Sequence, residues 1–160
     1  MTGGAYSIPE VKRLLLTLVA AKAGGRVAEA GTSVGEGAEA IARSLPAGTR
    51  FVTCELDAAR AAEARGRLMG LPVELVEGDW RDVLPPRGPF ELLFFDAGGI
   101  DDDAIDLLAP GGILVKDDMT PGRPIEGDPV RELLLRNPRL EATELLVTPR
   151  MAAIVAVRRA

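Results

Sequence analysis

The sequence predicts an α/β fold in which helices cover both faces of a doubly wound, mostly parallel β-sheet. Apolar strand-like runs alternate with helical patterns along most of the chain, and a glycine-rich turn between Gly31 and Gly37 follows the first strand. The last two strand-like runs are joined only by residues 148–150. Strands joined so closely pair directly only when antiparallel, so the last strand should oppose the others.

The first helix is expected from about Ile8 to Ala23, because apolar residues recur there at helical spacing, and Gly24 should end it. Asp57 is expected to cap a later helix. The other expected elements follow in chain order: strand Arg26–Ala30, helix Gly35–Ser44, strand Phe51–Glu55, a helix to Met69, strand Val73–Val76, strand Phe90–Phe95, helix Asp102–Leu108, a turn at Ala109–Gly112, strand Ile113–Lys116, helix Pro129–Arg136, and strands Leu140–Val147 and Ala152–Val157.

Composition narrows the class of protein. With 160 residues and 47% hydrophobic content, residues 1–160 are expected to form a single domain. A net charge of -5 argues against nucleic acid as a partner and favours a small-molecule ligand. The chain shows no membrane-spanning run and no signal-peptide pattern. Cys54 is the only cysteine and lies in an apolar run, so a buried thiol and a cytoplasmic location are expected.

The chain contains no histidine, the side chain most often used as a general base and as a transition-metal ligand. Any chemistry must therefore use carboxylates, lysine, tyrosine or positioning alone.

The glycine-rich turn does not fit the dinucleotide fingerprint. Gly31 and Gly35 lie four residues apart, and Ser33 and Glu36 occupy the places where that fingerprint needs its second and third glycines. Glu29 precedes the turn. The pattern indicates a different nucleotide-like ligand, or simply a tight turn between a strand and a helix.

Two further segments point to a nucleoside. Glu55 ends the second strand, where an acid can accept hydrogen bonds from both ribose hydroxyls. Its alternative role is helix capping, for which Asp57 is better placed. After the third strand, Asp79 is suited to an adenine amino group and Trp80 offers an apolar ring face. Alternatively, Trp80 covers the core from a loop.

Three aspartates follow two neighbouring strands. Asp96 ends the fourth strand, and Asp117 and Asp118 end the fifth. Carboxylates grouped in this way suit a hard divalent cation such as Mg²⁺, Ca²⁺ or Mn²⁺. Acids at strand ends also cap helices and solvate loops, which is the alternative.

The ordered motifs resemble those of the class I S-adenosylmethionine-dependent methyltransferases, and most closely those of the catechol/caffeoyl-CoA type O-methyltransferases. The motifs are Glu-x-Gly-Thr-x-x-Gly from Glu29, Val-Thr-x-Glu-x-Asp from Val52, Glu-Gly-Asp-x-x-Asp-x-Leu-Pro from Glu77, Phe-x-x-x-Phe-x-Asp from Phe90, and Leu-x-Pro-Gly-Gly-x-Leu-Val-x-Asp-Asp from Leu108. Together they cover nearly the whole chain.

The resemblance implies a Rossmann-like, seven-stranded methyltransferase sheet that binds S-adenosylmethionine and transfers its methyl group to a small-molecule acceptor, favouring an oxygen nucleophile. It makes Asp96 the catalytic residue, beside the sulfonium and the acceptor, and it matches Asp96, Asp117 and Asp118 to a metal site. The implied cofactor-binding residues are Glu29, Gly31, Thr32, Ser33, Gly35 and Gly37 for the methionine portion, Glu55 and Leu56 on the ribose side, Gly78, Asp79 and Trp80 for the adenine, and Asp96.

The chain departs from the family in three ways. Asp118 stands where the family has Asn, and no lysine follows Asp96 to serve as a base, although Lys116 could supply positive charge near the acceptor. Little chain precedes the first helix, which indicates an open site or one completed by a partner, as in a homodimer. The loop 119–128, which contains Arg123, is expected to form part of the acceptor wall.

Two other functions remain open at this point. The first is a non-catalytic S-adenosylmethionine-binding or interaction domain, which the missing lysine favours. The second is a nicotinamide-dependent oxidoreductase, which shares Glu55 and the sheet but fails the glycine spacing.

Overall fold

The computed structural model describes residues 9–22 and 24–160. The expected ends of the first helix, Ile8 and Ala23, lie outside the described residues. In chain order the elements are α1 (Pro9–Ala20), β1 (Arg26–Ala30), α2 (Glu36–Arg43), β2 (Arg50–Glu55), α3 (Ala58–Leu68), β3 (Glu74–Glu77), α4 (Trp80–Val83), the 3₁₀ turn η1 (Pro85–Arg87), β4 (Phe90–Phe95), α5 (Asp102–Asp106), β5 (Leu108–Met119), α6 (Pro129–Leu135), β6 (Leu140–Thr148) and β7 (Met151–Arg158).

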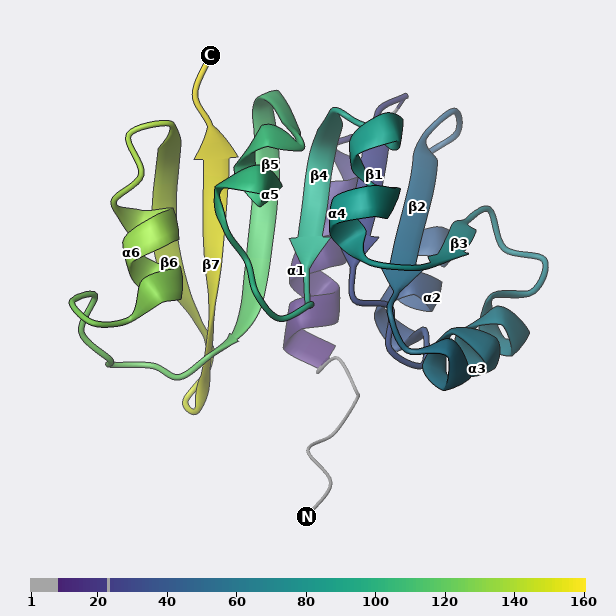
Figure 1. The fold of residues 1–160 in the computed structure, drawn as a ribbon, viewed down its shortest axis with the longest axis horizontal. Helices are drawn as coiled ribbons and strands as arrows, with labels where there is room; N and C mark the ends of the chain where they lie inside the picture. Colours follow the sequence, from purple (N-terminus) through teal and green to yellow (C-terminus); the bar gives the residue numbers. More distant parts are fainter. Residues whose placement is uncertain (1–8, 23) are drawn as a thin grey trace.

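The strands form one seven-stranded sheet in the order β3-β2-β1-β4-β5-β7-β6. Neighbouring strands among β1 to β5 pair in parallel, whereas β7 is antiparallel to both β5 and β6. The predicted α/β class, the parallel arrangement and the reversed last strand are therefore confirmed (Figure 1).

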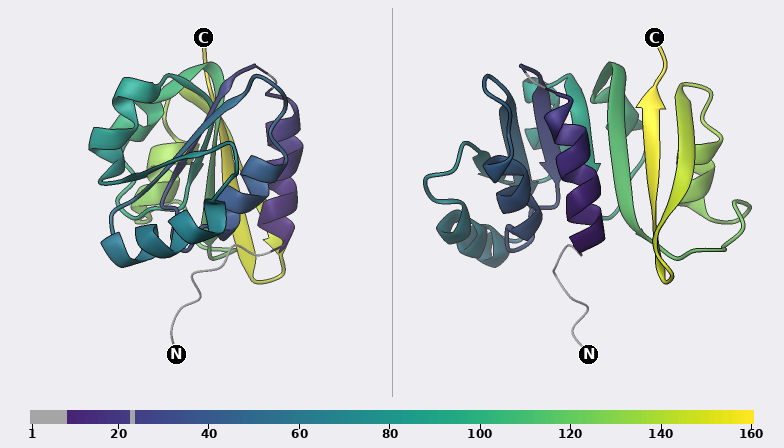
Figure 2. Two further views of the ribbon diagram at one scale, coloured as in Figure 1. Left: turned by 90° about the vertical axis from the view of Figure 1, so that its right-hand side faces the viewer. Right: turned by 180° about the vertical axis from the view of Figure 1, so that it is seen from behind.

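Helices cover both faces of the sheet. The views in Figure 2 show α1, α2 and α3 on one face and α4, α5 and α6 on the other. Because side chains alternate along a strand, each strand supplies both cores. In β4, for example, Phe94 packs in the layer under α1 and α2, whereas Leu93 and Phe95 pack in the layer under α4 and α5.

Two expectations about local structure were wrong. The turn expected at Ala109–Gly112 belongs to β5, which begins at Leu108 and extends to Met119. It pairs irregularly with β4 there, and Gly112 lies so close that an added Cβ would be 2.6 Å from the carbonyl oxygen of Phe90. Residues 80–83 were expected as a loop but form α4, whose four residues are too few to show helical periodicity.

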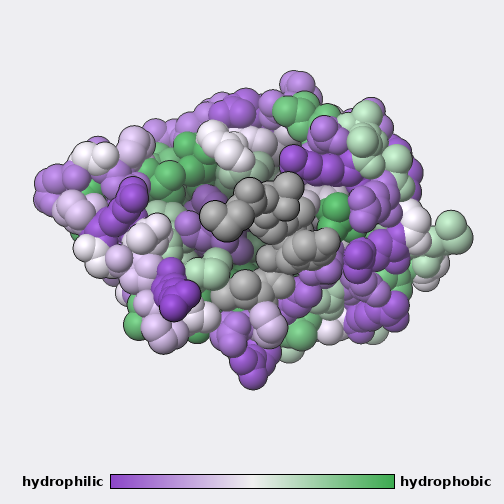
Figure 3. Space-filling model, turned by 90° about the horizontal axis from the view of Figure 1, so that it is seen from below, coloured by the Kyte–Doolittle hydropathy of each residue, from purple (hydrophilic) through white to green (hydrophobic). Residues whose placement is uncertain are grey.

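The topology brings the carboxyl ends of β1 to β5 to one edge of the sheet, which is the lower edge in Figure 1. Seen from this edge, the surface mixes hydrophobic with hydrophilic residues (Figure 3). Ligands of open α/β sheets bind at this edge, beyond the strand ends. Among the described residues, no helix has both the length and the apolar character needed to cross a bilayer.

Candidate functional site

The turn after β1 is held against both neighbouring strands. The backbone N–H groups of Gly31 and Thr32 both donate to the carbonyl oxygen of Cys54 in β2, and Asp96 N donates to Ala30 O on the other side. Gly31 has a φ of +94°, and an added Cβ would lie 2.7 Å from the backbone nitrogen of Ala97. Only glycine allows both this conformation and this close approach.

Buried hydroxyl and carboxyl groups of β1, β2 and the turn are joined by hydrogen bonds. Thr53 Oγ1 donates to Glu29 Oε2 at 2.5 Å and lies 2.5 Å from Thr32 Oγ1. Burial raises the pKa of Glu29 well above its ordinary value, although the Thr53 hydrogen bond opposes this. Thr53 was not predicted as a site residue. No local sequence signal identifies it, because Thr53 meets Glu29 only through the register of β1 with β2.

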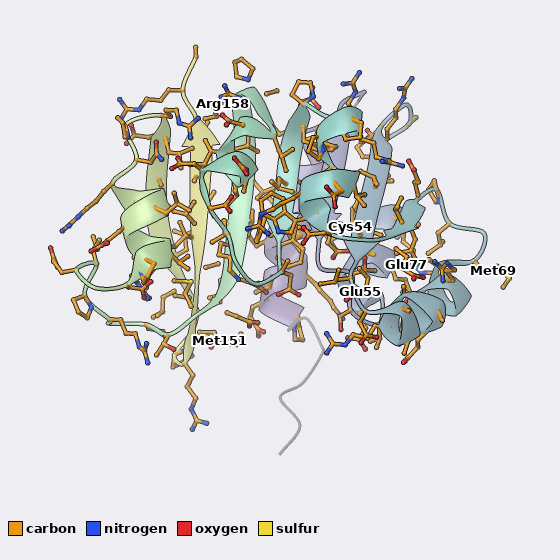
Figure 4. The ribbon with its side chains drawn as sticks, viewed as in Figure 1. Cys54, Glu55, Met69, Glu77, Met151 and Arg158 are labelled. Carbon is orange, nitrogen blue, oxygen red and sulfur yellow. The ribbon has the colours of Figure 1, made fainter. Side chains whose placement is uncertain are left out.

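Glu55 connects the turn to the end of β2. Its two carboxylate oxygens accept hydrogen bonds from Ser33 N at 2.7 Å and from Asp57 N at 2.9 Å. Each oxygen retains acceptor capacity for a ligand hydroxyl. Leu56, which follows directly, is 71% exposed and offers apolar surface at the same edge. Asp57 caps α3 by accepting from Arg60 N, as predicted. Figure 4 shows Glu55 at the lower end of β2.

The segment after β3 is firmly folded. Gly78 N donates to Glu55 O, and Asp79 caps α4 by accepting from Arg81 N. Trp80 is 5% exposed and meets Phe95 edge to face, with ring centroids 5.1 Å apart. The ring therefore covers the core, as the alternative interpretation of this residue had it, but from a helix and not from a loop. Its contact with adenine stays a prediction.

Arg81 ties this segment to the loop after β4. Its guanidinium lies 4.4 Å from the centroid of the Trp80 ring and donates to Gly99 O and to Asp101. The loops that follow β3 and β4 are thus fixed relative to each other.

The other two predicted glycines belong to α2. Gly35 is its N-cap, with a φ of +89°, and packs against α3 so closely that an added Cβ would lie 3.3 Å from Ala64. Gly37 is buried in the first turn of the helix. The turn from Gly31 to Gly35 therefore delivers the N-terminus of α2, with its partial positive charge, to the carboxyl edge.

The three predicted metal ligands do meet. One carboxylate oxygen from each of Asp96, Asp117 and Asp118 lies within 4.8 Å of the others. A β-bulge brings them together: Lys116 pairs with Ile154 but Met119 pairs with Ala152, so β5 has one extra residue. Asp117 is consequently buried while the next residue, Asp118, is exposed and has a φ of +58°.

The cluster is electrostatically strained. Burial raises the pKa of Asp96 to about 6, and burial together with the negative charges of Asp96 and Asp118 raises that of Asp117 to about 8. The side chains of Asp96 and Asp117 share a hydrogen bond, yet Asp117 Oδ1 is buried without a partner among the described residues. A buried carboxylate oxygen without a donor, in a group of three acids, fits a divalent cation.

The segment after the cluster is anchored by a buried arginine. The guanidinium of Arg131 is bonded to Thr120 O at 2.7 Å, to Asp128 and to Glu144, and its side chain is 1% exposed. The loop between β5 and α6 is therefore held at both of its ends. It begins at Thr120 and not at Met119, which is buried in β5.

The two cations that the sequence places near the acceptor differ in their surroundings. Lys116 Nζ donates to Asp117 O at 3.0 Å, whereas Arg123 is exposed in the loop.

The structure therefore places nearly all predicted site residues at one edge, but not all of them face outward. Gly35 and Gly37 are buried at the start of α2. The other buried site residues are Glu29, Thr32, Glu55, Trp80 and Asp117. The residues that combine location at the edge with some exposure are Gly31, Ser33, Leu56, Gly78, Asp79, Asp96 and Asp118.

This combination of a 3-2-1-4-5-7-6 sheet, a glycine turn after β1, an acid at the end of β2 and an aspartate at the end of β4 defines the class. The chain has the fold of the class I S-adenosylmethionine-dependent methyltransferases.

Solved structures with this fold include O-methyltransferases. An O-methyltransferase from Bacillus cereus in complex with SAH has 25% identity and a TM-score of 0.80, and the match covers 98% of this chain and 84% of that one. TomG from Streptomyces achromogenes, an O-methyltransferase in complex with SAM, has 25% identity and a TM-score of 0.79, with 98% and 82% covered.

Curated relatives carry similar names. A protein-L-isoaspartate O-methyltransferase of Methylorubrum populi is 33% identical over 140 residues, which are 85% of this chain and 63% of that protein. A transmembrane O-methyltransferase homolog of Mus musculus is 40% identical over 82 residues, which are 48% of this chain and 32% of that protein. The chain thus spans less than two thirds of the length of either relative. No protein-family model matches it.

We expect Gly31→Ala to lower the free energy of unfolding by about 2–4 kcal/mol, because the new Cβ is strained and meets the backbone at Ala97. Urea unfolding followed by circular dichroism measures the change. Gly66→Ala in α3 is the matched control, because no atom lies within 4 Å of its added Cβ. It should stabilise the protein by about 0.5–1 kcal/mol. Equal effects of the two substitutions would contradict the close contact.

Without divalent metal, the protein should lose stability as the pH rises. The pKa of Asp117 is raised in the folded state, so its protonated form stabilises the fold at low pH and this contribution is lost as the pH rises through about 8. Urea unfolding in chelator between pH 5 and pH 9 should show a fall on the order of 1–3 kcal/mol. Asp117→Asn should flatten this profile, whereas Asp103→Asn, at an exposed position of α5, should leave it unchanged. A profile that stays equally steep in Asp117→Asn would refute the assignment.

Proposed function

We propose that the chain binds S-adenosylmethionine and transfers its methyl group to an oxygen atom of a small molecule. The observation that carries the proposal is the hydrogen bond from Ser33 N to the carboxylate of Glu55. This bond joins the glycine turn after β1 to the acid at the end of β2. The resemblance of the motifs and the O-methyltransferase names of the relatives support it. We also propose a cytoplasmic location, which fits a chain whose single cysteine cannot form an internal disulfide.

The residues present suit this cofactor. The close approach at Gly31 leaves backbone beside the turn without a side chain in the way, so the amino-acid end of the cofactor can lie along it. Glu55 can accept from the ribose hydroxyls, and exposed Leu56 can cover a face of the nucleoside. Bound S-adenosylmethionine supplies an already activated methyl group, so strong acid–base catalysis by the protein is not required.

The acidic cluster is suited to the acceptor. Asp96 has a pKa raised to about 6 and lies beside Asp117, so the pair can accept a proton near neutral pH from a hydroxyl held there. The neighbouring loop can hold the acceptor in line with the methyl group, and this orientation lowers the activation barrier. That loop, residues 120–128, is anchored at both ends by Arg131.

We further propose that a divalent cation binds Asp96, Asp117 and Asp118. The support is the 4.8 Å grouping of the three carboxylates and the buried Asp117 Oδ1, which has no partner among residues 9–22 and 24–160. These residues would hold the ion, which when bound would lower the pKa of an acceptor hydroxyl. Asp118 can serve as a ligand as well as Asn would, because both residues offer oxygen and both tolerate its positive φ.

The cofactor proposal predicts binding of S-adenosylmethionine and S-adenosylhomocysteine in titration calorimetry. Glu55→Gln should weaken S-adenosylhomocysteine by about tenfold or more, because it removes a charged hydrogen-bond acceptor. Glu77→Gln is the control: Glu77 lies at the end of the adjacent strand β3 (Figure 4) and forms an ion pair with Arg65. It should change the affinity less than about twofold.

Three results would separate the alternatives. Binding of NAD in place of S-adenosylhomocysteine in a thermal-shift assay would support an oxidoreductase and reject the proposal. Cofactor binding without methyl transfer to any acceptor would support a binding domain. Transfer to an isoaspartyl peptide but not to a simple catechol would reject a small-molecule acceptor.

The metal proposal predicts that Mg²⁺ raises the thermal midpoint of the protein at pH 8, and more weakly at pH 6, because the ligands must lose their protons first. Differential scanning fluorimetry with Mg²⁺ or chelator measures this. Asp117→Asn should abolish the response and Asp103→Asn should retain it. A midpoint that is the same in Mg²⁺ and in chelator at both pH values would exclude the ion.

A further inference from the structure

A cavity lies at the opposite edge of the sheet from the acidic cluster. It has a volume of about 370 Å³ and opens at the amino ends of β1, β2, β3 and β4, which begin at Arg26, Arg50, Glu74 and Phe90. These strand ends lie at the upper edge in Figure 1. The cavity is large enough for a small organic ligand, and nothing in the proposed methyl transfer uses it.

The wall of the cavity carries a surplus of positive charge in an acidic protein. Arg26, Arg50 and Arg87 line it together with one carboxylate, Glu74, so the lining has two more positive than negative side chains. The whole chain, in contrast, has a net charge of -5. A local reversal of charge around a concavity favours an anionic ligand.

The surplus belongs to Arg26 and Arg50. Glu74 is engaged by Arg87, which donates to it from Nε at 3.0 Å and from Nη2 at 2.7 Å. Arg26 donates from Nη1 to the carbonyl oxygen of Gly88 at 2.7 Å, which orients the guanidinium without neutralising it. Within residues 9–22 and 24–160, no side chain pairs with the guanidinium of Arg50. Outside the lining, the Glu91 carboxylate accepts from the main-chain nitrogen of Arg26.

Two of the three arginines are held in place before any ligand arrives. Arg26 is tied to Gly88, and Arg87 is tied to Glu74 and also to Val83 O at 2.7 Å. Fixed guanidinium groups lose little freedom when they bind an oxyanion, and their planar forks suit it. The remaining lining is largely apolar and includes the buried side chain of Phe51.

We propose that this cavity binds a small phosphate monoester, with its dianionic group between Arg26 and Arg50 and its organic part against the apolar wall. A phosphate monoester carries a charge of about -1.5 to -2 at neutral pH, which matches the two unneutralised guanidinium groups. This cavity is independent of the proposed cofactor site, because the two lie at opposite ends of the strands. Both ligands can therefore be bound at once.

The test uses phenyl phosphate, inorganic phosphate and phenol as probes, titrated into the ¹⁵N-labelled full chain at low ionic strength and followed by NMR. Phenyl phosphate should bind saturably and more tightly than inorganic phosphate, and phenol should not bind. Arg50→Gln should weaken phenyl phosphate by about tenfold or more, because a charged donor is lost. Arg87→Gln, a second variant, should weaken it as well, because it leaves the negative charge of Glu74 unpaired in the wall of the cavity.

The matched control is Arg150→Gln, the same charge change at an exposed arginine in the turn between β6 and β7. It should leave the affinity for phenyl phosphate unchanged. Three outcomes would overturn the proposal: no saturable binding, equal weakening by Arg50→Gln and Arg150→Gln, or displacement of phenyl phosphate by S-adenosylhomocysteine. The last result would place the probe at the cofactor edge. Failure of S-adenosylhomocysteine to bind would reject the proposed function and leave this site standing.

Discussion

The approach of the Gly31 backbone to the backbone at Asp96 and Ala97 is the contact on which the site depends. The turn after β1 has a neighbour on each side, and main-chain hydrogen bonds to Cys54 O and from Asp96 N fix it between them. A side chain at Gly31 would meet the peptide of Ala97 at 2.7 Å and push the fourth strand end away. The position of the Asp96 carboxylate is therefore set by a residue that has no side chain.

Much of the fold follows from local patterns that the sequence displays openly. Alternating strands and helices, the Asp57 cap and the short link before Met151 each have a physical meaning that holds without knowledge of the rest of the chain. These patterns were sufficient for the class of fold and for the reversed last strand. The grouping of the strand-end motifs at one edge follows from the parallel order of the strands.

The details that escaped prediction depend on contacts between distant segments. The β-bulge before Met119 is defined by the pairing of β5 with β7, and the sequence of β5 alone does not predict it. The Thr53 hydrogen bond to Glu29 depends on the register of two strands. α4 is too short to have a pattern of its own and is stabilised by the Asp79 cap and by the packing of Trp80 on Phe95. Side chains such as Glu29 matched a motif, but the motif does not reveal that they are buried.

The anchoring of the loop after β5 by Arg131 has a consequence for how such a protein can change over evolutionary time. Thr120 and Asp128 are tied to one buried guanidinium, so the residues between them form a span whose two ends are fixed. Substitutions within that span, such as at Arg123, can alter what the loop presents without moving Asp117, because the bonds of Arg131 hold both ends of the span in place. The loop can therefore diverge in sequence while the acidic cluster stays in place.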